Sequence, residues 1–167
     1  MSKLFTVPEE MLKRIEVFQQ WVANGALLFM MAIITIDVIG RNFFHNPLKG
    51  TYEMTELSSA LLVFFALAVT HRVGDHITID FLVERFSEKL RNLILAAVEM
   101  IISIVLFLMA TNIFDNGLRM MERHSTTTDL AIPLYPFLFL IALTLMVFMF
   151  TAIFKAITYI RLVVKKS

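Results

Sequence analysis

Residues 130–154 carry no charged side chain, and this uninterrupted apolar stretch restricts the possible fold more than any other feature of the chain. A helix of about 20 largely apolar residues crosses the roughly 30 Å hydrocarbon core of a bilayer. Residues 93–114 form a second such window, interrupted only by Glu99, and residues 21–39 form a third, with Asp37 near its end. The sequence therefore predicts an all-α membrane protein.

A fourth window is too short to cross a bilayer on its apolar residues alone. Residues 57–70 are apolar or weakly polar, and at 1.5 Å per residue they cover roughly 21 Å. Extending the helix back to Thr51, a candidate N-cap after the turn residue Pro47, supplies enough length but carries Glu53 and Glu56 toward the membrane. Glu53 then lies in the first turn, where the helix dipole favours negative charge.

We expect one domain, residues 1–167, with four transmembrane helices and two amphipathic interfacial helices. The spans are expected at residues 21–39, 51–70, 93–114 and 130–154. Residues 8–20 and 82–92 place apolar side chains at helical spacing between charged ones. This pattern is typical of helices that lie in the headgroup region of a membrane, so we expect the two interfacial helices there.

Composition excludes several functional classes. The chain has 58% hydrophobic and only 17% charged residues, and its net charge of +1 leaves no basic surface for nucleic acid. The absence of Cys excludes disulfides and thiol chemistry. The four His lie in connections or at span ends, and no known catalytic motif is present. We therefore expect no catalytic residue, no cofactor and no metal site, and we expect the chain not to be an enzyme.

The distribution of Lys and Arg predicts the topology. Eleven of the 15 basic residues lie in the N-terminal segment, the middle connection and the C-terminal segment, and four lie in the other two connections. Loops rich in Lys and Arg stay on the cytoplasmic side. We expect both termini and the middle connection in the cytoplasm.

Ionisable residues near the ends of the spans are the strongest candidates for a functional role. Asp37 and Arg41 are spaced i and i+4, so they can pair on one face of the first span. Arg41 can equally reach Glu53 or Glu56, because the connection between the first two spans is short. A structural ion-pair network is the favoured interpretation, and a proton or ion relay is the alternative.

Glu99 lies one to two turns inside the third span. One interpretation is that its side chain snorkels to the membrane surface, and the other is a buried polar contact with a neighbouring helix or subunit. The sequence leaves both open.

Two stretches resemble a known family. The first is V-I-G-R-N-F-F-H-N-P-L at residues 38–48, followed by T-Y-E-M-T-E-L at residues 51–57, and the second is H-R-V-G-D-H-I-T-I-D-F-L at residues 71–82. In order and spacing they resemble the small membrane subunit of tripartite ATP-independent periplasmic (TRAP) transporters. The residues that match are Arg41, Pro47, Glu53 and Glu56 in the first stretch, and Arg72, His76 and Asp80 in the second.

The resemblance implies a partner role. In that family the small subunit packs against a large, elevator-type membrane subunit that binds substrate and sodium, and a periplasmic binding protein delivers the substrate. The resemblance thus implies that the chain pairs with the large subunit as a heterodimer and acts as a scaffold in a sodium-coupled transporter of organic acids. It also implies contact with membrane lipids of a bacterial inner membrane, and it makes the chain a candidate for docking the binding protein. Many members have a Trp followed by two adjacent acids, whereas here Tyr52 precedes Glu53 and the second acid is Glu56.

A rival hypothesis from another class remains. The chain could act alone as a small homo-oligomeric proton-coupled exporter or channel that uses Asp37, Glu53 and Glu56. Against this, five Gly and four Pro leave little material for the broken helices on which transporters build substrate sites. The sequence therefore favours a substrate site in another chain.

Overall fold

Four long helices make up the chain in the computed structural model, which describes residues 6–73 and 87–165. They are α1 (Thr6–Phe44), α2 (Thr51–Val73), α4 (Glu88–Glu122) and α5 (Tyr135–Lys165). Within these described ranges no strand is present, and the only β pairing is an isolated bridge between Thr126 and Pro133. The predicted all-helical fold is confirmed.

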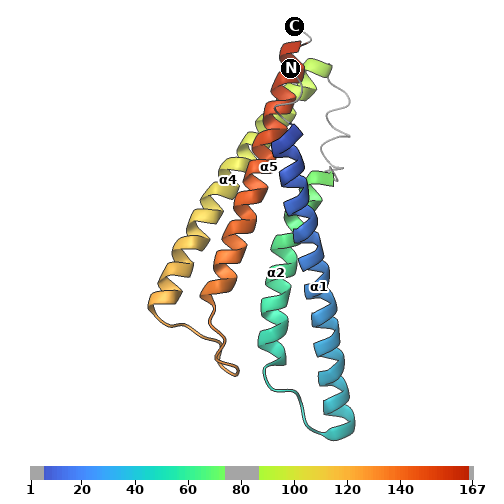
Figure 1. Ribbon diagram of the computed structural model, residues 1–167, viewed down its shortest axis with the longest axis vertical. Coiled ribbons are helices and arrows are strands. Elements are labelled where there is room, and N and C mark those ends of the chain that lie inside the picture. The colour runs from blue at the N-terminus through green and yellow to red at the C-terminus, as the bar shows by residue number, and fades with distance from the viewer. Residues whose placement is uncertain (1–5, 74–86, 166–167) are drawn as a thin grey trace.

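The helices form two antiparallel hairpins, α1–α2 and α4–α5, as Figure 1 shows. Each hairpin is closely packed within itself, whereas the hairpins meet mainly through α2 and α5 and, less extensively, through α1 and α5. The connections 45–50 and 123–134 lie at one end of the molecule, which we call the loop end. The start of α1 and the end of α5 lie together at the opposite end.

Three of the helices are long and apolar enough to cross a membrane. They are Arg14–Phe44 within α1, Glu88–Glu122, and Tyr135–Val164 within α5. The chain is therefore a multi-pass membrane protein. The fourth expected span, residues 51–70, lies in α2, which is not in this set, so that span stays a prediction; the 23 residues of α2 would reach about 35 Å as a helix.

The buried faces of the helices combine polar and apolar side chains, whereas many large apolar side chains are exposed. The buried face of α4 carries Asn92, Ala96, Glu99, Ser103, Leu106, Ala110 and Gly117, whereas Leu93, Ile101 and Ile104 on the same helix are exposed. Leu106 and Ala110 join Ile141 and Leu145 of α5 in the apolar core, against which Phe64 of α2 packs. An apolar outer surface of this kind is suited to lipid or to another membrane helix, since neither offers hydrogen bonds.

Glu99 is only 7% exposed, so it does not snorkel to the membrane surface. Its place on the buried face of α4 supports the other interpretation, a polar contact inside the bundle.

The expected interfacial helix at residues 8–20 is not a separate element. α1 runs without a break through residues 8–20 and 21–39, because no Pro or turn sequence separates them. Among its described polar side chains Glu16 and Gln19 are buried whereas Arg14 and Gln20 are exposed, and Phe18 and Trp21 are exposed as well. Burial of Glu16 and Gln19 against the bundle replaces the expected contact with headgroups.

The second expected interfacial helix, residues 82–92, lies partly outside the described residues. Its described part, from Glu88 onward, is continuous with the third expected span in α4. In the second motif, Arg72 is in the last turn of α2, and His76 and Asp80 lie outside the described residues.

The start of α2 differs in one detail from the prediction. The backbone N–H of Met54 donates to the carbonyl of Gly50 at 3.0 Å, so Gly50 and not Thr51 occupies the N-cap position. The Thr51 hydroxyl donates backwards to the carbonyl of Leu48 at 2.9 Å. The expected cap is therefore wrong, because Gly50 adopts a positive φ of 75° that turns the chain directly into the helix.

Replacing Gly50 tests this turn. In Gly50→Ala the new Cβ would overlap the Leu130 side chain and would also strain a left-handed backbone, at a cost of about 1–3 kcal/mol. We expect the thermal midpoint of the purified chain in mild detergent to fall. Gly25→Ala is the matched control, because a Cβ there meets nothing within 4 Å and Ala favours the helix. Equal midpoints for the two variants would contradict the described turn.

Candidate functional site

Asp37 organises the connection between α1 and α2. Its Oδ2 accepts a hydrogen bond from Arg41 Nη2 at 2.8 Å, so the predicted i, i+4 pair is present. Its Oδ1 accepts from the backbone N–H of Leu48 at 2.9 Å, which folds the connection back onto α1 just after Pro47. Asp37 is buried, whereas the Arg41 side chain is 67% exposed. Asp37 therefore holds the connection in place, and Arg41 supports it from the surface.

Glu53 links the two hairpins. Its Oε1 accepts a hydrogen bond from the backbone N–H of Asp129 at 2.6 Å, and its Oε2 accepts from that of Leu130 at 3.0 Å. The partners are 76 and 77 positions away in the sequence. Glu53 is only 7% exposed, and hydrogen bonds to an ionised carboxylate are stronger than neutral ones. This carboxylate thus joins α2 to the connection 123–134 at the loop end. It does not pair with Arg41, which was one of the alternatives from the sequence.

The connection 123–134 presents its amides to Glu53 because it is folded back on itself. The N–H of Thr127 donates to the carbonyl of Ile132 at 2.9 Å, and the N–H of Ile132 donates to the Thr127 hydroxyl at 3.0 Å. Ala131 takes a positive φ of 52° at the tip. Successive amides in such a turn converge on one point and can receive an anion. Here the anion is supplied by α2.

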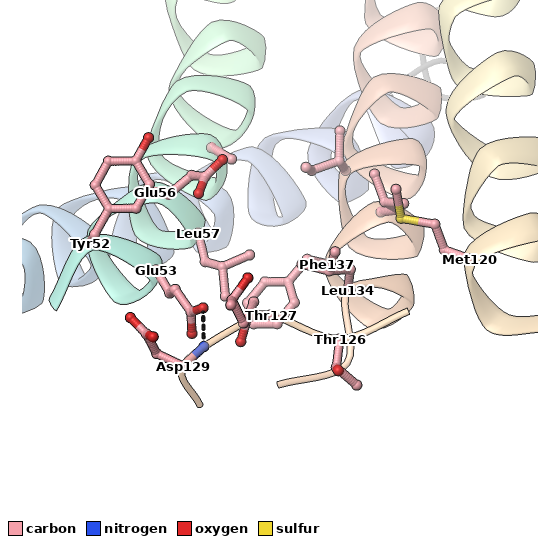
Figure 2. Close-up of a pocket in the computed structure, with 14 residues that line it drawn as sticks. Tyr52, Glu53, Glu56, Leu57, Met120, Thr126, Thr127, Asp129, Leu134 and Phe137 are labelled. Atoms are coloured by element: carbon pink, nitrogen blue, oxygen red, sulfur yellow. Dashed lines mark hydrogen bonds between the residues drawn. The ribbon is translucent and has the colours of Figure 1, made fainter. Parts of the chain in front are cut away.

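A cavity of about 510 Å³ lies between α2 and the α4–α5 hairpin, which we call the α2–α5 cavity. Figure 2 shows Glu53 directed to the backbone of Asp129 at its edge and Glu56 further along α2. Its apolar lining is Leu57, Ala60, Met120, Leu134, Phe137, Leu138 and Ile141, and its polar lining is Tyr52, Glu53, Glu56, Thr126, Thr127, Thr128 and Asp129. The cavity therefore combines an apolar floor with an acidic, hydroxyl-rich edge.

Glu56 differs from Glu53 in every respect that matters for its role. It is exposed on the cavity side of α2, and its carboxylate makes no hydrogen bond or ion pair with the described residues. The sequence left open which of the two acids has the family's role. In the structure Glu53 anchors the connection 123–134, whereas the carboxylate of Glu56 has no hydrogen-bond partner among the described residues.

A polar contact that the sequence analysis missed connects the hairpins near the termini. The Thr151 hydroxyl of α5 donates to Glu16 Oε1 of α1 at 2.8 Å, across 135 positions of sequence. Glu16 is only 2% exposed. The signal available in the sequence was that Glu16 and Gln19 are spaced i and i+3, so they share one face of the helix.

These groups are arranged to hold helices together. In the part of the chain that the structure describes, no group of three or more His, Cys, Asp or Glu side chains is placed to hold a metal ion. Asp37 and Glu53 use their carboxylates on fixed backbone amides, which is a structural use of charge. Of the residues proposed from the sequence, the structure thus brings Asp37 and Arg41 together at one connection and places Glu53 and Glu56 at the cavity.

Comparison with known proteins gives two matches. The sequence family described as tripartite ATP-independent periplasmic transporters, DctQ component, matches residues 30–162. The sialic acid TRAP transporter permease protein SiaT of Haemophilus influenzae (strain 86-028NP) is 25% identical over 97 residues, which cover 58% of this chain and 16% of that protein. The chain therefore spans a small part of the length of this relative. No solved structure shows a significant match.

The role of Glu53 as an anchor is tested by Glu53→Gln. One carboxylate oxygen becomes an NH₂ group that faces an amide donor, so one charge-assisted hydrogen bond is lost and the other is weakened. We expect the thermal midpoint of the isolated chain to fall by several degrees. Glu56→Gln is the matched control on the same helix and should leave the midpoint unchanged, and a similar fall in both variants would refute the assignment.

The unequal roles of Asp37 and Arg41 predict unequal effects of their removal. Asp37→Ala leaves the part-buried N–H of Leu48 without its acceptor, whereas Arg41→Ala removes only an exposed i, i+4 pair. Asp37→Ala should therefore lower the thermal midpoint clearly more than Arg41→Ala does. Proteolysis of the connection 45–50 gives a second readout, and faster cleavage in Arg41→Ala than in Asp37→Ala would show that the ranking is wrong.

Proposed function

The chain belongs to the DctQ component family of tripartite ATP-independent periplasmic (TRAP) transporters, and from this premise we propose that it is the fixed scaffold subunit of a sodium-coupled transporter for organic acids. Its partners would be a large membrane subunit, which moves and binds substrate, and a periplasmic substrate-binding protein. The observation that carries the proposal is the family match over residues 30–162.

The internal contacts support a scaffold role. The two hairpins are joined at one end by Glu53 and the connection 123–134, and near the other end by Glu16 and Thr151. A bundle fastened at both ends resists sliding of one hairpin past the other. Elevator transport requires such a fixed element, against which a second domain moves.

The outer surface supports a membrane partner. Large apolar side chains are exposed along α1 and α4, among them Leu28, Met31, Ile101 and Leu108. In the curated relative, the matched segment is 16% of the protein, so most of that permease lies outside it. We propose that a separate large subunit supplies the corresponding part here and covers some of this apolar surface.

We propose that α2 is the fourth span and that the loop end faces the periplasm. Its acidic first turn is compatible with membrane insertion because Glu53 is satisfied by the amides of Asp129 and Leu130. The excess of Lys and Arg at the other end favours a cytoplasmic location for both termini in a bacterial inner membrane. The periplasmic binding protein would then dock at the loop end.

The rival function, an autonomous proton-coupled exporter or channel, is less well supported. It would need Asp37, Glu53 and Glu56 to exchange protons or ions. Two of these carboxylates accept hydrogen bonds from fixed backbone amides, which suits a permanent negative charge better than a titrating one. Of the three, only Glu56 lines the cavity without a hydrogen bond to the described residues.

Co-purification and reconstitution test the proposal together. When the tagged chain is co-expressed with the large membrane subunit of its transporter, we expect the two to be retained together in mild detergent. Vesicles that contain the chain alone should show no pH-dependent ion flux, whereas the full set of subunits should take up an organic acid under a sodium gradient. Isolation of the chain by itself, with proton flux, would favour the rival.

A further inference from the structure

The α2–α5 cavity lies on the side of α2 that faces away from α1. Met54, Ser58 and Leu61 of α2 line a groove shared with α1, whereas Tyr52 and Glu56 line the α2–α5 cavity. At 100° per residue, positions 54 and 56 point in nearly opposite directions from the helix axis. Leu57 and Phe137 line both hollows, so the two are adjacent, whereas Tyr52 and Glu56 belong to the α2–α5 cavity.

The charge of the cavity lining is one-sided. It contains the carboxylates of Glu53, Glu56 and Asp129, and none of its described lining residues is Lys, Arg or His. Glu53 is already occupied by two backbone amides. Arg41, a basic residue at the same end of the molecule, is engaged by Asp37. Neither Glu56 nor Asp129 forms an ion pair with the described residues.

Glu56 is the group in most need of a partner. It lies three residues after Glu53 along α2, about 4.5 Å further from the loop end. Its neighbours on the cavity wall include Leu57, Ala60 and Phe137, which are apolar. A carboxylate beside apolar walls at membrane depth is costly unless a cation accompanies it.

We infer that the α2–α5 cavity receives a basic side chain, Lys or Arg, of the large membrane subunit, and that this side chain forms an ion pair with Glu56. The inference rests on the proposed function, since it names the contact through which that partner binds. The aliphatic stem of the basic side chain lies on the apolar floor, and its charged end reaches Glu56 and the Thr hydroxyls at the edge. The cavity, at about 510 Å³, has the size of a typical binding pocket, about 300–1,000 Å³.

A membrane lipid with an amino headgroup offers similar charge but a poorer fit in depth. Headgroup amines lie at the membrane surface, level with the connection 123–134 in the proposed orientation, whereas Glu56 lies a turn of helix deeper. A long basic side chain that projects sideways from a neighbouring membrane helix reaches that depth. The mixed lining, with hydroxyls beside the carboxylate, also suits the several donors of a guanidinium or ammonium group.

Variants of Glu56 in the co-expressed transporter test the inference. Glu56→Gln removes the charge with little change of shape, and we expect retention of the large subunit to fall about tenfold or more, as is usual when one member of a buried interfacial charge pair is removed. Glu56→Lys should lower retention further. Glu122→Gln is the matched control, because Glu122 is an exposed acid at the end of α4 outside the cavity lining. The thermal midpoint of each isolated variant shows that the fold is intact.

The outcomes separate the inference from the proposed function. Failure of the wild-type chain to retain the large subunit would contradict the proposed function itself. If Glu56→Gln and Glu56→Lys retain as much of the large subunit as the wild-type chain does, the inference is overturned and the scaffold role still stands. The same holds if these variants lose bound aminophospholipid but keep the large subunit. The inference is supported if a Lys→Glu or Arg→Glu change at one position of the large subunit restores binding to the Glu56→Lys variant. It is overturned if no such change at any basic position on the membrane surface of the large subunit restores binding.

Discussion

The hydrogen bonds between the Glu53 carboxylate and the amides of Asp129 and Leu130 are the interaction on which the arrangement of the two hairpins depends. They bring the start of α2 against the connection 123–134, and Gly50 must lack a side chain because Leu130 lies directly against it. Asp37 performs a similar task locally by holding the N–H of Leu48. Buried carboxylates are costly in a membrane protein, and here the cost is offset because each accepts hydrogen bonds from fixed backbone amides.

Polar contacts inside and apolar side chains outside give the molecule its membrane character. Lipid removes the hydrophobic drive between helices, so packing and polar contacts must hold the hairpins together. The Glu16–Thr151 contact does this near the termini, and Glu53 does it at the loop end. A bundle braced at both ends, with its apolar surface left for lipid and a membrane partner, is consistent with membership of the DctQ family and with a scaffold in which the moving parts lie in another chain.

Hydropathy predicted the helical fold, and helical spacing predicted the Asp37–Arg41 pair, because both depend on residues close together in the sequence. The missed features depend on distant residues. Nothing near Glu53 indicates an acceptor for amides 76 positions away, since their convergence requires the fold of the connection 123–134. The sequence predicts an interfacial helix at residues 8–20 because apolar side chains recur there at helical spacing between charged ones, whereas Glu16 and Gln19 are buried inside the bundle. An amphipathic pattern does not distinguish a helix with its polar side in water from one with its polar side in a membrane bundle.

Amide hydrogen exchange at Asp129 and Leu130, resolved residue by residue in the purified chain, tests the central contact most directly. Both amides lie in a connection and not in a helix, so protection there must come from the carboxylate of Glu53. We expect both to exchange at least about tenfold more slowly than the same residues in an unstructured peptide, because a closed hydrogen bond must open before exchange. Exchange at the unprotected rate would show that Glu53 does not hold this connection and that the two hairpins are not joined at the loop end.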